Sequence, residues 1–247
     1  MEIIEKIKAK KPLDRLDDSF VAEFLEDFLK KNNKLNKKLL ENKLKKKDFE
    51  LIVKSVRNEL NKIYGQFWIN DKLDLLSHKS AKERLNIYKR VYKNIFIRIG
   101  KPKTVLDLGC GLNPLSYKFI GKNVYFTAVE LTDYDCERLK EYFKKNNIKG
   151  EVIKADIRTY NKFPNTDVCF MFKILDSLEN KGHFIAENLI KNIKAKYIIA
   201  SFSTYNIRGR RMNYPKRGWF EMMLKRLGYK FMKFEDVNEI FYIVNKD

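Results

Sequence analysis

Apolar residues recur along this chain with two different periods, and the change falls near residue 100. Before it, they return every three or four positions, as in the segment with Val21, Phe24, Leu25 and Phe28, which is typical of amphipathic helices. Beyond it, short apolar runs alternate with helical patterns. The sequence therefore predicts a helical domain over residues 1–100 and a domain of mixed strands and helices over residues 101–247.

The first hundred residues contain further helical segments. One is expected over residues 48–63 and another over residues 80–97, which leads into a Gly-Lys-Pro boundary at 100–102. A lysine run from 30 to 47 holds nine lysines and one acid, interleaved with leucines. Its spacing predicts an amphipathic helix with a solvated basic face.

Strands and helices alternate from residue 103 onward. Strands are expected near 104–108, 124–130, 151–155, 167–172 and 197–202, with helices near 113–120, 132–146 and 181–194. Short repeats of this kind predict a parallel sheet with helices on both faces. A last helix near 219–227 precedes two strands, 230–234 and 239–244, which would complete a seven-stranded, mostly parallel α/β sheet.

The composition indicates the kind of partner. There are 52 Lys and Arg against 32 Asp and Glu, a net charge of +20, and such a charge favours a polyanion. No apolar run approaches the ~20 residues that span a bilayer, and the first residues lack a signal-peptide layout, so we expect a cytoplasmic protein without a membrane partner. We also expect a monomer. The three cysteines are far apart, which fits neither a disulfide framework nor a metal site.

The segment 105–114 carries the most specific chemistry, because it runs from an apolar strand through a Gly-x-Gly turn into a helix start. Gly109 and Gly111 allow a tight turn and close approach of the backbone to a ligand. Asn113 is a good N-cap, and Pro114 suits the first helical position. Pro114 also stands where a dinucleotide site has its third glycine, and no P-loop ending is present. The pattern favours a ligand with a ribose and no phosphate.

Two acids follow at the ends of the next two expected strands. Glu130 lies 21 residues after Gly109, the offset at which an acid accepts hydrogen bonds from ribose hydroxyls. Asp156 ends the following strand, where a carboxylate can face an adenine amino group. The alternative is a turn with two helix-capping acids. This series resembles the class I, Rossmann-like S-adenosylmethionine (SAM) methyltransferases, and the resemblance implies a cofactor site of Asp107, Gly109, Cys110, Gly111, Glu130, Asp156 and Ile157.

Longer blocks lie at residues 78–84, 109–115, 170–179, 201–203, 209–212 and 219–221, together with Tyr214. They resemble the Arm (aminoglycoside-resistance) methyltransferases of small-subunit rRNA. The resemblance implies methylation of guanine N7 in the decoding-site helix of 16S rRNA, on the assembled small subunit, with resistance to aminoglycosides as a consequence. Two positions depart from the family pattern, Ala81 for a usual Thr and Asp176 for a frequent Pro, so the target nucleotide stays open.

The resemblance also assigns individual roles. Arg84 is implied as the partner of the SAM carboxylate, a contact that suits a bidentate guanidinium, with a helix-surface charge as the alternative. Lys173 and Phe172 are expected to line the pocket for the target base at the carboxyl end of the fourth strand. The alternatives are a Lys173 side chain that extends to solvent and a Phe172 ring in the core.

The segment after the fourth strand excludes some methyl-transfer reactions. It lacks the Asn/Asp-Pro-Pro-Tyr type of turn that polarises an exocyclic amine, and Cys169 lies inside the strand rather than where a nucleophile for pyrimidine C5 would stand. Guanine N7 already carries a lone pair. Its methylation requires positioning and exclusion of water but no obligatory base.

Two basic segments are candidates for RNA contacts. The first comprises Lys43, Lys45, Lys46 and Lys47, and the second, after the fifth strand, comprises Arg208, Arg210, Arg211, Lys216 and Arg217. The second is predicted to be a mobile loop whose cations meet rRNA phosphates, against the alternative of a merely solvated loop. Two other functions remain: another RNA base methyltransferase of the same fold, and a ribosome assembly factor with a vestigial SAM fold. The intact cofactor cradle, which comprises Gly109, Gly111, Glu130 and Asp156, argues against the assembly factor.

Overall fold

The computed structural model describes residues 2–178, 182–205, 210–213 and 215–246. The chain forms two compact units, which we call the helical unit, Met1–Ile69, and the sheet unit, Asn70–Asp247. The division falls about thirty residues before the predicted boundary at 100, because the helices between 79 and 99 pack on the sheet. Among the described residues, no helix is both long and apolar enough to cross a membrane.

The helical unit consists of α1 (Glu2–Lys8), α2 (Asp18–Lys30), α3 (Asn33–Leu40) and α4 (Lys46–Ile63), with two short 3-10 turns, η1 (Leu13–Arg15) and η2 (Gly65–Phe67). Its core is apolar, and Ile7, Val21 and Ile52 are fully buried. The prediction of one helix over 30–47 is wrong. α3 ends at Leu40, a turn follows, and Lys46 and Lys47 open α4, where Asp48 accepts a hydrogen bond from the Lys45 N–H.

The sheet unit begins with two short helices, α5 (Lys79–Arg84) and α6 (Tyr88–Ile99), where a single helix was predicted. Hydrogen bonds of the 3-10 type, to the carbonyl three residues earlier, interrupt the α-helix here. They run from Leu85 N to Lys82 O (3.2 Å) and from Ile87 N to Arg84 O (2.9 Å). The Arg84 side chain, at the end of α5, is only 2% exposed.

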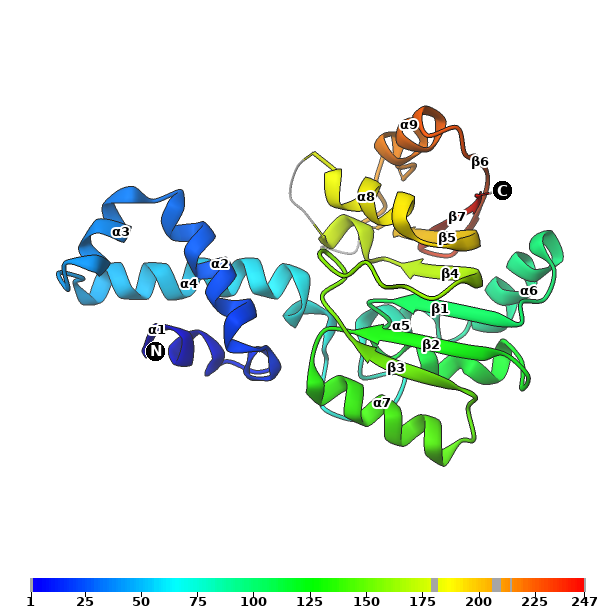
Figure 1. The fold of residues 1–247 in the computed structure, drawn as a ribbon, viewed down its shortest axis with the longest axis horizontal. Coiled ribbons are helices and arrows are strands. Elements are labelled where there is room, and N and C mark those ends of the chain that lie inside the picture. Colours follow the sequence, from blue (N-terminus) through cyan, green and yellow to red (C-terminus); the bar gives the residue numbers. More distant parts are fainter. Residues whose placement is uncertain (1, 179–181, 206–209, 214, 247) are drawn as a thin grey trace. The chain divides into compact units, whose positions relative to one another are not determined.

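Seven strands form one sheet in the order β3-β2-β1-β4-β5-β7-β6 (Figure 1). They are β1 (Thr104–Leu108), β2 (Tyr125–Glu130), β3 (Gly150–Lys154), β4 (Thr166–Phe172), β5 (Ala195–Ser203), β6 (Lys230–Asp236) and β7 (Glu239–Asn245). The first five are parallel to their neighbours, and β7 is antiparallel to both β5 and β6. The predicted seven-stranded, mostly parallel sheet with an antiparallel end is confirmed.

Helices cover both faces of this sheet. One face packs against α8 (Phe184–Asn192) and α9 (Gly218–Arg226) in a core that includes Leu106, Met171 and Phe202. The other packs against α6, α7 (Asp133–Lys145) and the 3-10 helix η3 (Asn113–Phe119), as ring contacts from Phe126 and Phe170 show. A further 3-10 turn, η4 (Leu175–Ser177), follows β4.

The strand order fixes where a ligand can enter. From β1 the chain moves outward to β2 and β3 and then returns to β4 on the other side of β1, so β1 and β4 flank a topological switch point. In open α/β sheets the crevice beyond the carboxyl ends of such strands is the usual ligand site. The Gly-x-Gly turn follows β1 directly, and Lys173 follows β4.

Candidate active site

The two glycines after β1 are held where a side chain could not fit. Gly109 and Gly111 have φ of +56° and +52°, in the left-handed region. A Cβ on Gly109 would lie 2.8 Å from Cδ1 of Ile174, and one on Gly111 would lie 2.6 Å from Nε2 of His78. The turn is thus closely packed between the segment before α5 and the segment after β4. Burial lowers the pKa of His78 to about 3, with Arg84 acting in the same direction.

Glu130, at the end of β2, faces this turn. Its carboxylate accepts hydrogen bonds from the backbone N–H of Gly111 (2.7 Å) and of Leu131 (3.0 Å). Burial, together with the charge of Asp135, raises the pKa of Glu130 to about 7 despite these donors. Cys110 lies beside it as a free, buried thiol whose pKa burial raises well above its usual range. Cys110 therefore contributes backbone to the cradle and no nucleophile.

Asp107 lies inside β1, the strand that leads into the Gly-x-Gly turn. Its carboxylate accepts a 2.7 Å hydrogen bond from Nδ2 of Asn113, and burial raises its pKa to about 7. Asn113 was expected to cap the following helix. Its amide instead reaches back to Asp107, while Leu112 occupies the N-cap position of η3.

Asp156 and Ile157 follow β3 at the same edge of the sheet. The Asp156 carboxylate forms an ion pair with Arg158, through Nη2 at 2.6 Å and Nε at 3.0 Å. The side chain of Asp156 keeps 22% exposure, and Ile157 is buried. A carboxylate with further lone pairs at the surface can still accept a hydrogen bond from a ligand amine.

A buried charge network connects α5, β4 and β7. Glu239, at the start of β7, is fully buried and accepts hydrogen bonds from Nη1 of Arg84 at 3.0 Å and from the hydroxyl of Ser201. The Nζ of Lys173 lies 3.2 Å from its other oxygen and also pairs with Glu83. Burial alone would raise the pKa of Glu239, but the charges of Arg84 and Lys173 outweigh it and hold that pKa below its usual range.

Lys173 and Phe172 adopt different roles at the end of β4. Lys173 has a φ of +57°, which is uncommon for a residue with a side chain, and its side chain is 9% exposed. Phe172 lies in the core. It stacks on Phe170 with centroids 4.8 Å apart, and the Arg84 guanidinium lies 4.8 Å above its ring. The Phe172 ring is buried, so the structure agrees with the alternative of a ring in the core.

The network contains residues that the sequence patterns did not single out. Glu83 lies within the block that resembles the Arm family, but no role followed from its neighbours. Glu239 had one visible signal, since it is a charged residue at the start of an otherwise apolar strand, Glu239–Asn245. Its partner Arg84 is 155 positions away, and Ser201 is 38 positions away.

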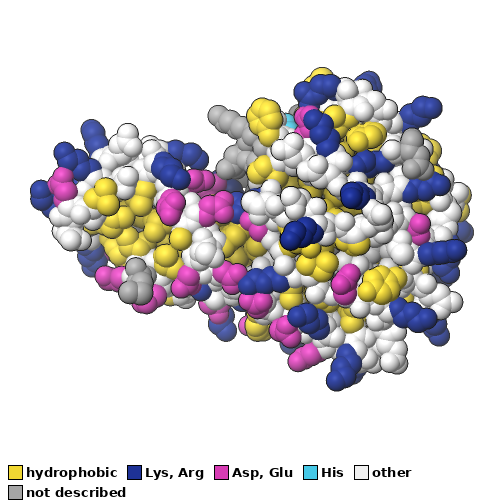
Figure 2. All heavy atoms as spheres, viewed as in Figure 1, with side chains coloured by type: hydrophobic (Ala, Val, Ile, Leu, Met, Phe, Trp, Pro, Cys, Tyr) yellow, Lys and Arg dark blue, Asp and Glu magenta, His cyan; other side chains and the backbone are white. Residues whose placement is uncertain are grey.

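The four lysines of the first basic segment lie at the surface of the helical unit, within the turn before α4 and its first residues. Lys43 pairs with Glu41 at 2.9 Å with its side chain 71% exposed. Figure 2 shows Lys and Arg side chains spread over the visible face of each unit rather than gathered in one patch.

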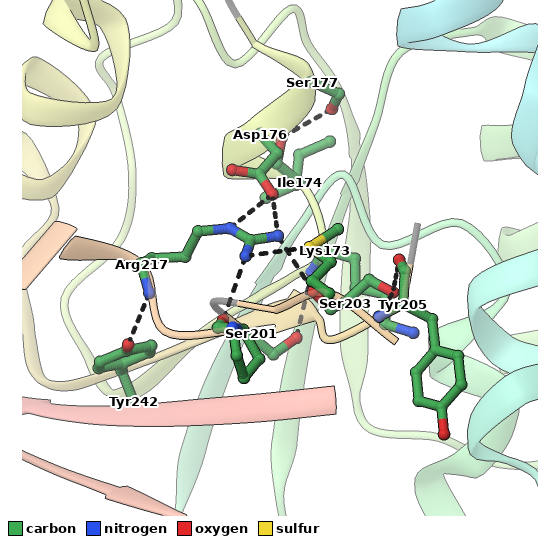
Figure 3. Close-up of polar contacts among 11 residues, drawn as sticks. Lys173, Ile174, Asp176, Ser177, Ser201, Ser203, Tyr205, Arg217 and Tyr242 are labelled. Carbon is green, nitrogen blue, oxygen red and sulfur yellow. Dashed lines mark hydrogen bonds and ion pairs between the residues drawn. The ribbon is translucent and has the colours of Figure 1, made fainter. Parts of the chain in front are cut away.

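The second basic segment has a mixed outcome. Arg208 lies outside the described residues, whereas Arg210, Arg211 and Lys216 are exposed. Arg211 pairs with Glu235. Arg217 differs from the prediction of a mobile cation. Its side chain is 11% exposed and forms an ion pair with Asp176 at 2.9 Å, as Figure 3 shows.

A family comparison agrees with this geometry. Residues 71–243 match the family model described as ribosomal RNA methyltransferase (FmrO). The chain belongs to the FmrO family. This match starts one residue after the beginning of the sheet unit and includes the Gly-x-Gly turn, Glu130, Lys173 and Glu239. The family resemblance seen in the sequence blocks is confirmed.

Individual relatives of this FmrO-family chain are distant. A 16S rRNA (guanine(1405)-N(7))-methyltransferase of Frankia casuarinae is 26% identical over 175 residues, which are 68% of this chain and 61% of that protein. The chain thus spans about three fifths of that relative's length. The solved structure of the 16S rRNA methylase RmtB superposes with a TM-score of 0.78 at 21% identity, covering 100% of this chain and 98% of that one. The 16S rRNA methyltransferase RmtF in complex with S-adenosyl-L-homocysteine gives 0.79 at 18% identity, with 100% and 97% coverage.

Proposed function

We propose that this protein is a SAM-dependent methyltransferase that modifies guanine N7 in the decoding-site helix of 16S rRNA, on the assembled small subunit. The observation that carries the proposal is the family match over 71–243, because the matched residues form a closely packed ligand cradle at the switch point of the sheet. The name of the Frankia relative supports the choice of guanine N7.

The cradle fits the proposed cofactor. Gly109 and Gly111 adopt the positive φ values that a tight turn after β1 requires, and the absence of side chains lets Ile174 and His78 pack directly against this turn. Glu130 lies at the strand end where ribose hydroxyls are usually bound, and two backbone donors hold its carboxylate. Asp156 and Ile157 would flank the adenine. When bound, SAM supplies an electrophilic methyl group.

The residues near β4 would serve the target base by positioning and by charge balance. Methylation at N7 leaves a positive charge on the purine, which an unpaired ammonium nearby would disfavour. Glu83 and Glu239 neutralise Lys173, and Glu239 also faces Arg84. Two cations and two carboxylates therefore balance at this edge of the sheet. No general base is required, since N7 offers its lone pair directly.

Modification at the proposed target would confer resistance to aminoglycosides. A methyl group and a positive charge in the decoding-site helix would repel a cationic aminoglycoside. Expression of the protein in a susceptible bacterium should then raise the inhibitory concentration of drugs that bind this helix.

The test is product identification. Purified small subunits are incubated with the protein and SAM that carries a labelled methyl group, and the rRNA is reduced with borohydride and treated with aniline. An N7-methylguanine should yield strand cleavage, which primer extension would place in the decoding-site helix. Label in rRNA without a cleavage site would indicate another base methyltransferase. No label in any RNA, with SAM bound normally, would indicate an assembly factor.

A further inference from the structure

The Arg217 side chain connects three segments at the edge of the sheet that holds Lys173 (Figure 3). Its Nε and Nη2 donate to Asp176 of η4, at 3.1 and 2.9 Å, and Nη2 also donates to the carbonyl of Ser203 at the end of β5, at 3.0 Å. Its Nη1 donates to the carbonyl of Pro215 at 3.1 Å. We call this set of contacts the Arg217 bridge.

The bridge uses the whole guanidinium. An arginine has one N–H on Nε and two on each Nη, five donors in all. The second Nη1 donor has the sulfur of Met212 at 3.7 Å, so each of the five donors has an acceptor. The guanidinium also lies 5.3 Å over the ring of Phe202. A phosphate could bind this group only by displacing an acceptor that is already in place.

The backbone at Arg217 is anchored as well. Its N–H donates to the hydroxyl of Tyr242 on β7 at 3.1 Å, and that hydroxyl donates to Glu221 on α9 at 2.9 Å. Both ends of the residue are thus fixed. The bridge spans from this anchored point to η4, which begins two residues after Lys173.

From these contacts we infer that Arg217 is a positioning residue for methyl transfer rather than a phosphate ligand. Through Asp176 and Ser203 it fixes the segments that follow β4 and β5, which frame the approach of the target base to Lys173. The inference rests on the proposed function, because it requires a target base that enters at this edge. A small misplacement of such a frame lowers the rate of the chemical step more than it lowers binding.

The test compares three variants with the wild-type protein in methylation of small subunits at several salt concentrations. Arg217→Met keeps the side chain over Phe202 but removes every donor, and Asp176→Asn removes the acidic partner with little change of shape. Lys216→Met is the comparator, because it removes an exposed cation from the adjacent position.

Arg217→Met and Asp176→Asn should each lower kcat by about tenfold or more, with KM for subunits changed less than about twofold. The double variant should resemble the more severe single variant, because both changes remove one shared ion pair. Lys216→Met, if Lys216 binds a phosphate, should raise KM and lower the log-salt slope by ~0.7–0.9 with kcat unchanged. SAM affinity, measured by calorimetry, should equal that of the wild type in all variants, which shows that the cradle is folded.

Two results would overturn the inference. If Arg217→Met raises KM and reduces the salt slope while Asp176→Asn tightens subunit binding, then Arg217 is a phosphate ligand that Asp176 restrains. If neither variant changes kcat, the bridge does not position anything that matters for transfer. Failure of the wild-type protein to methylate subunits would instead refute the proposed function, so the two failures are distinguishable.

Discussion

At the scale of single residues, the carboxylate of Glu239 is the shared acceptor of the buried charge network. It is fully buried and shared by Arg84, Lys173 and Ser201. Removing one partner of a buried ion pair leaves the other charge in a medium of low polarity, and that loss usually exceeds what the pair itself contributes. Within this network Arg84 pairs with Glu239, whereas Lys173 pairs with both Glu239 and Glu83.

We predict that Glu239→Gln lowers the free energy of unfolding by about 3–5 kcal/mol, because Arg84 would lose its buried counter-charge. Urea denaturation at neutral pH measures it. The matched control is Glu83→Gln, since Glu83 also pairs with Lys173 but its side chain is 29% exposed, and its loss should cost less than about 1 kcal/mol. Equal costs for the two variants would show that Glu239 does not hold the network together.

A second prediction concerns Glu130, whose pKa burial raises to about 7. Ribose hydroxyls donate hydrogen bonds, so they favour the ionised carboxylate, and cofactor binding should release a proton near neutral pH. SAM affinity should therefore increase as the pH rises from about 6 to about 8 and then level off. Calorimetry over this range measures the effect.

Glu130→Gln should bind SAM more weakly and lose most of this pH dependence, because its amide does not titrate in this range. Asp107, whose pKa is also raised to about 7, would account for any remaining part. An affinity that falls as the pH rises would contradict the assignment of Glu130 to the ribose. So would a variant with the wild-type profile.

At the scale of elements, sequence patterns predicted the strands far better than the ends of the helices. The apolar runs of β1, β2 and β4 are buried on both faces of a parallel sheet, which leaves a strong signal in the sequence. The break after α3 left one weak signal, Asn42, which adopts a φ of +53° just past the helix end, as asparagine often does at such positions. The break after α5 has no comparable signal. The α5 break accompanies the burial of Arg84 against Glu239, a contact between residues 155 positions apart.

The residues of the candidate site also differ in how well the sequence predicts them. Gly109, Gly111 and Glu130 form a local pattern that follows from strand–turn–helix chemistry, and the structure places Glu130 in hydrogen-bonding contact with the turn. Glu239 and Asp176 acquire their roles only from partners brought close by the fold. The sequence marks Glu239 only as a charge at the start of an apolar strand and Asp176 only as a departure from the family pattern, and neither signal names a partner.

The basic element before α4 provides the third prediction. Lys43, Lys45, Lys46 and Lys47 are exposed, and three of them flank or open a helix N-terminus, where backbone N–H groups add positive potential. Replacing all four with Glu should weaken subunit binding and reduce its log-salt slope by about 0.7–0.9 for each phosphate that is no longer neutralised. SAM binding should not change.

The matched control replaces four other exposed lysines with Glu, namely Lys101, Lys122, Lys149 and Lys194. Each precedes a parallel strand of the sheet unit, so these four lie at the amino-terminal edge of the sheet, opposite the cradle. Both variants change the net charge equally. If they weaken subunit binding equally, overall charge rather than the helical unit governs docking.

At the scale of the whole molecule, the excess of 52 basic over 32 acidic residues acts on two equilibria in opposite directions. Like charges repel one another within the folded protein, and this repulsion lowers its stability. The same charges attract rRNA phosphates, and binding releases condensed counterions. Salt screens the repulsion and also removes the advantage of releasing counterions.

The last prediction follows from this opposition. Raising KCl from about 0.05 M to about 0.5 M should increase the Tm of the free protein, because a Debye length that falls from roughly 14 to 4 Å screens repulsion between surface lysines. Over the same range, subunit binding should weaken by several orders of magnitude if it involves six or more phosphates. Calorimetric melting and filter binding measure the two quantities on one preparation. A Tm that falls with KCl would mean that attractive surface ion pairs, such as Lys38–Asp48, outweigh the net repulsion. The charge would then be balanced locally, and its excess would not be the feature that selects a polyanionic partner.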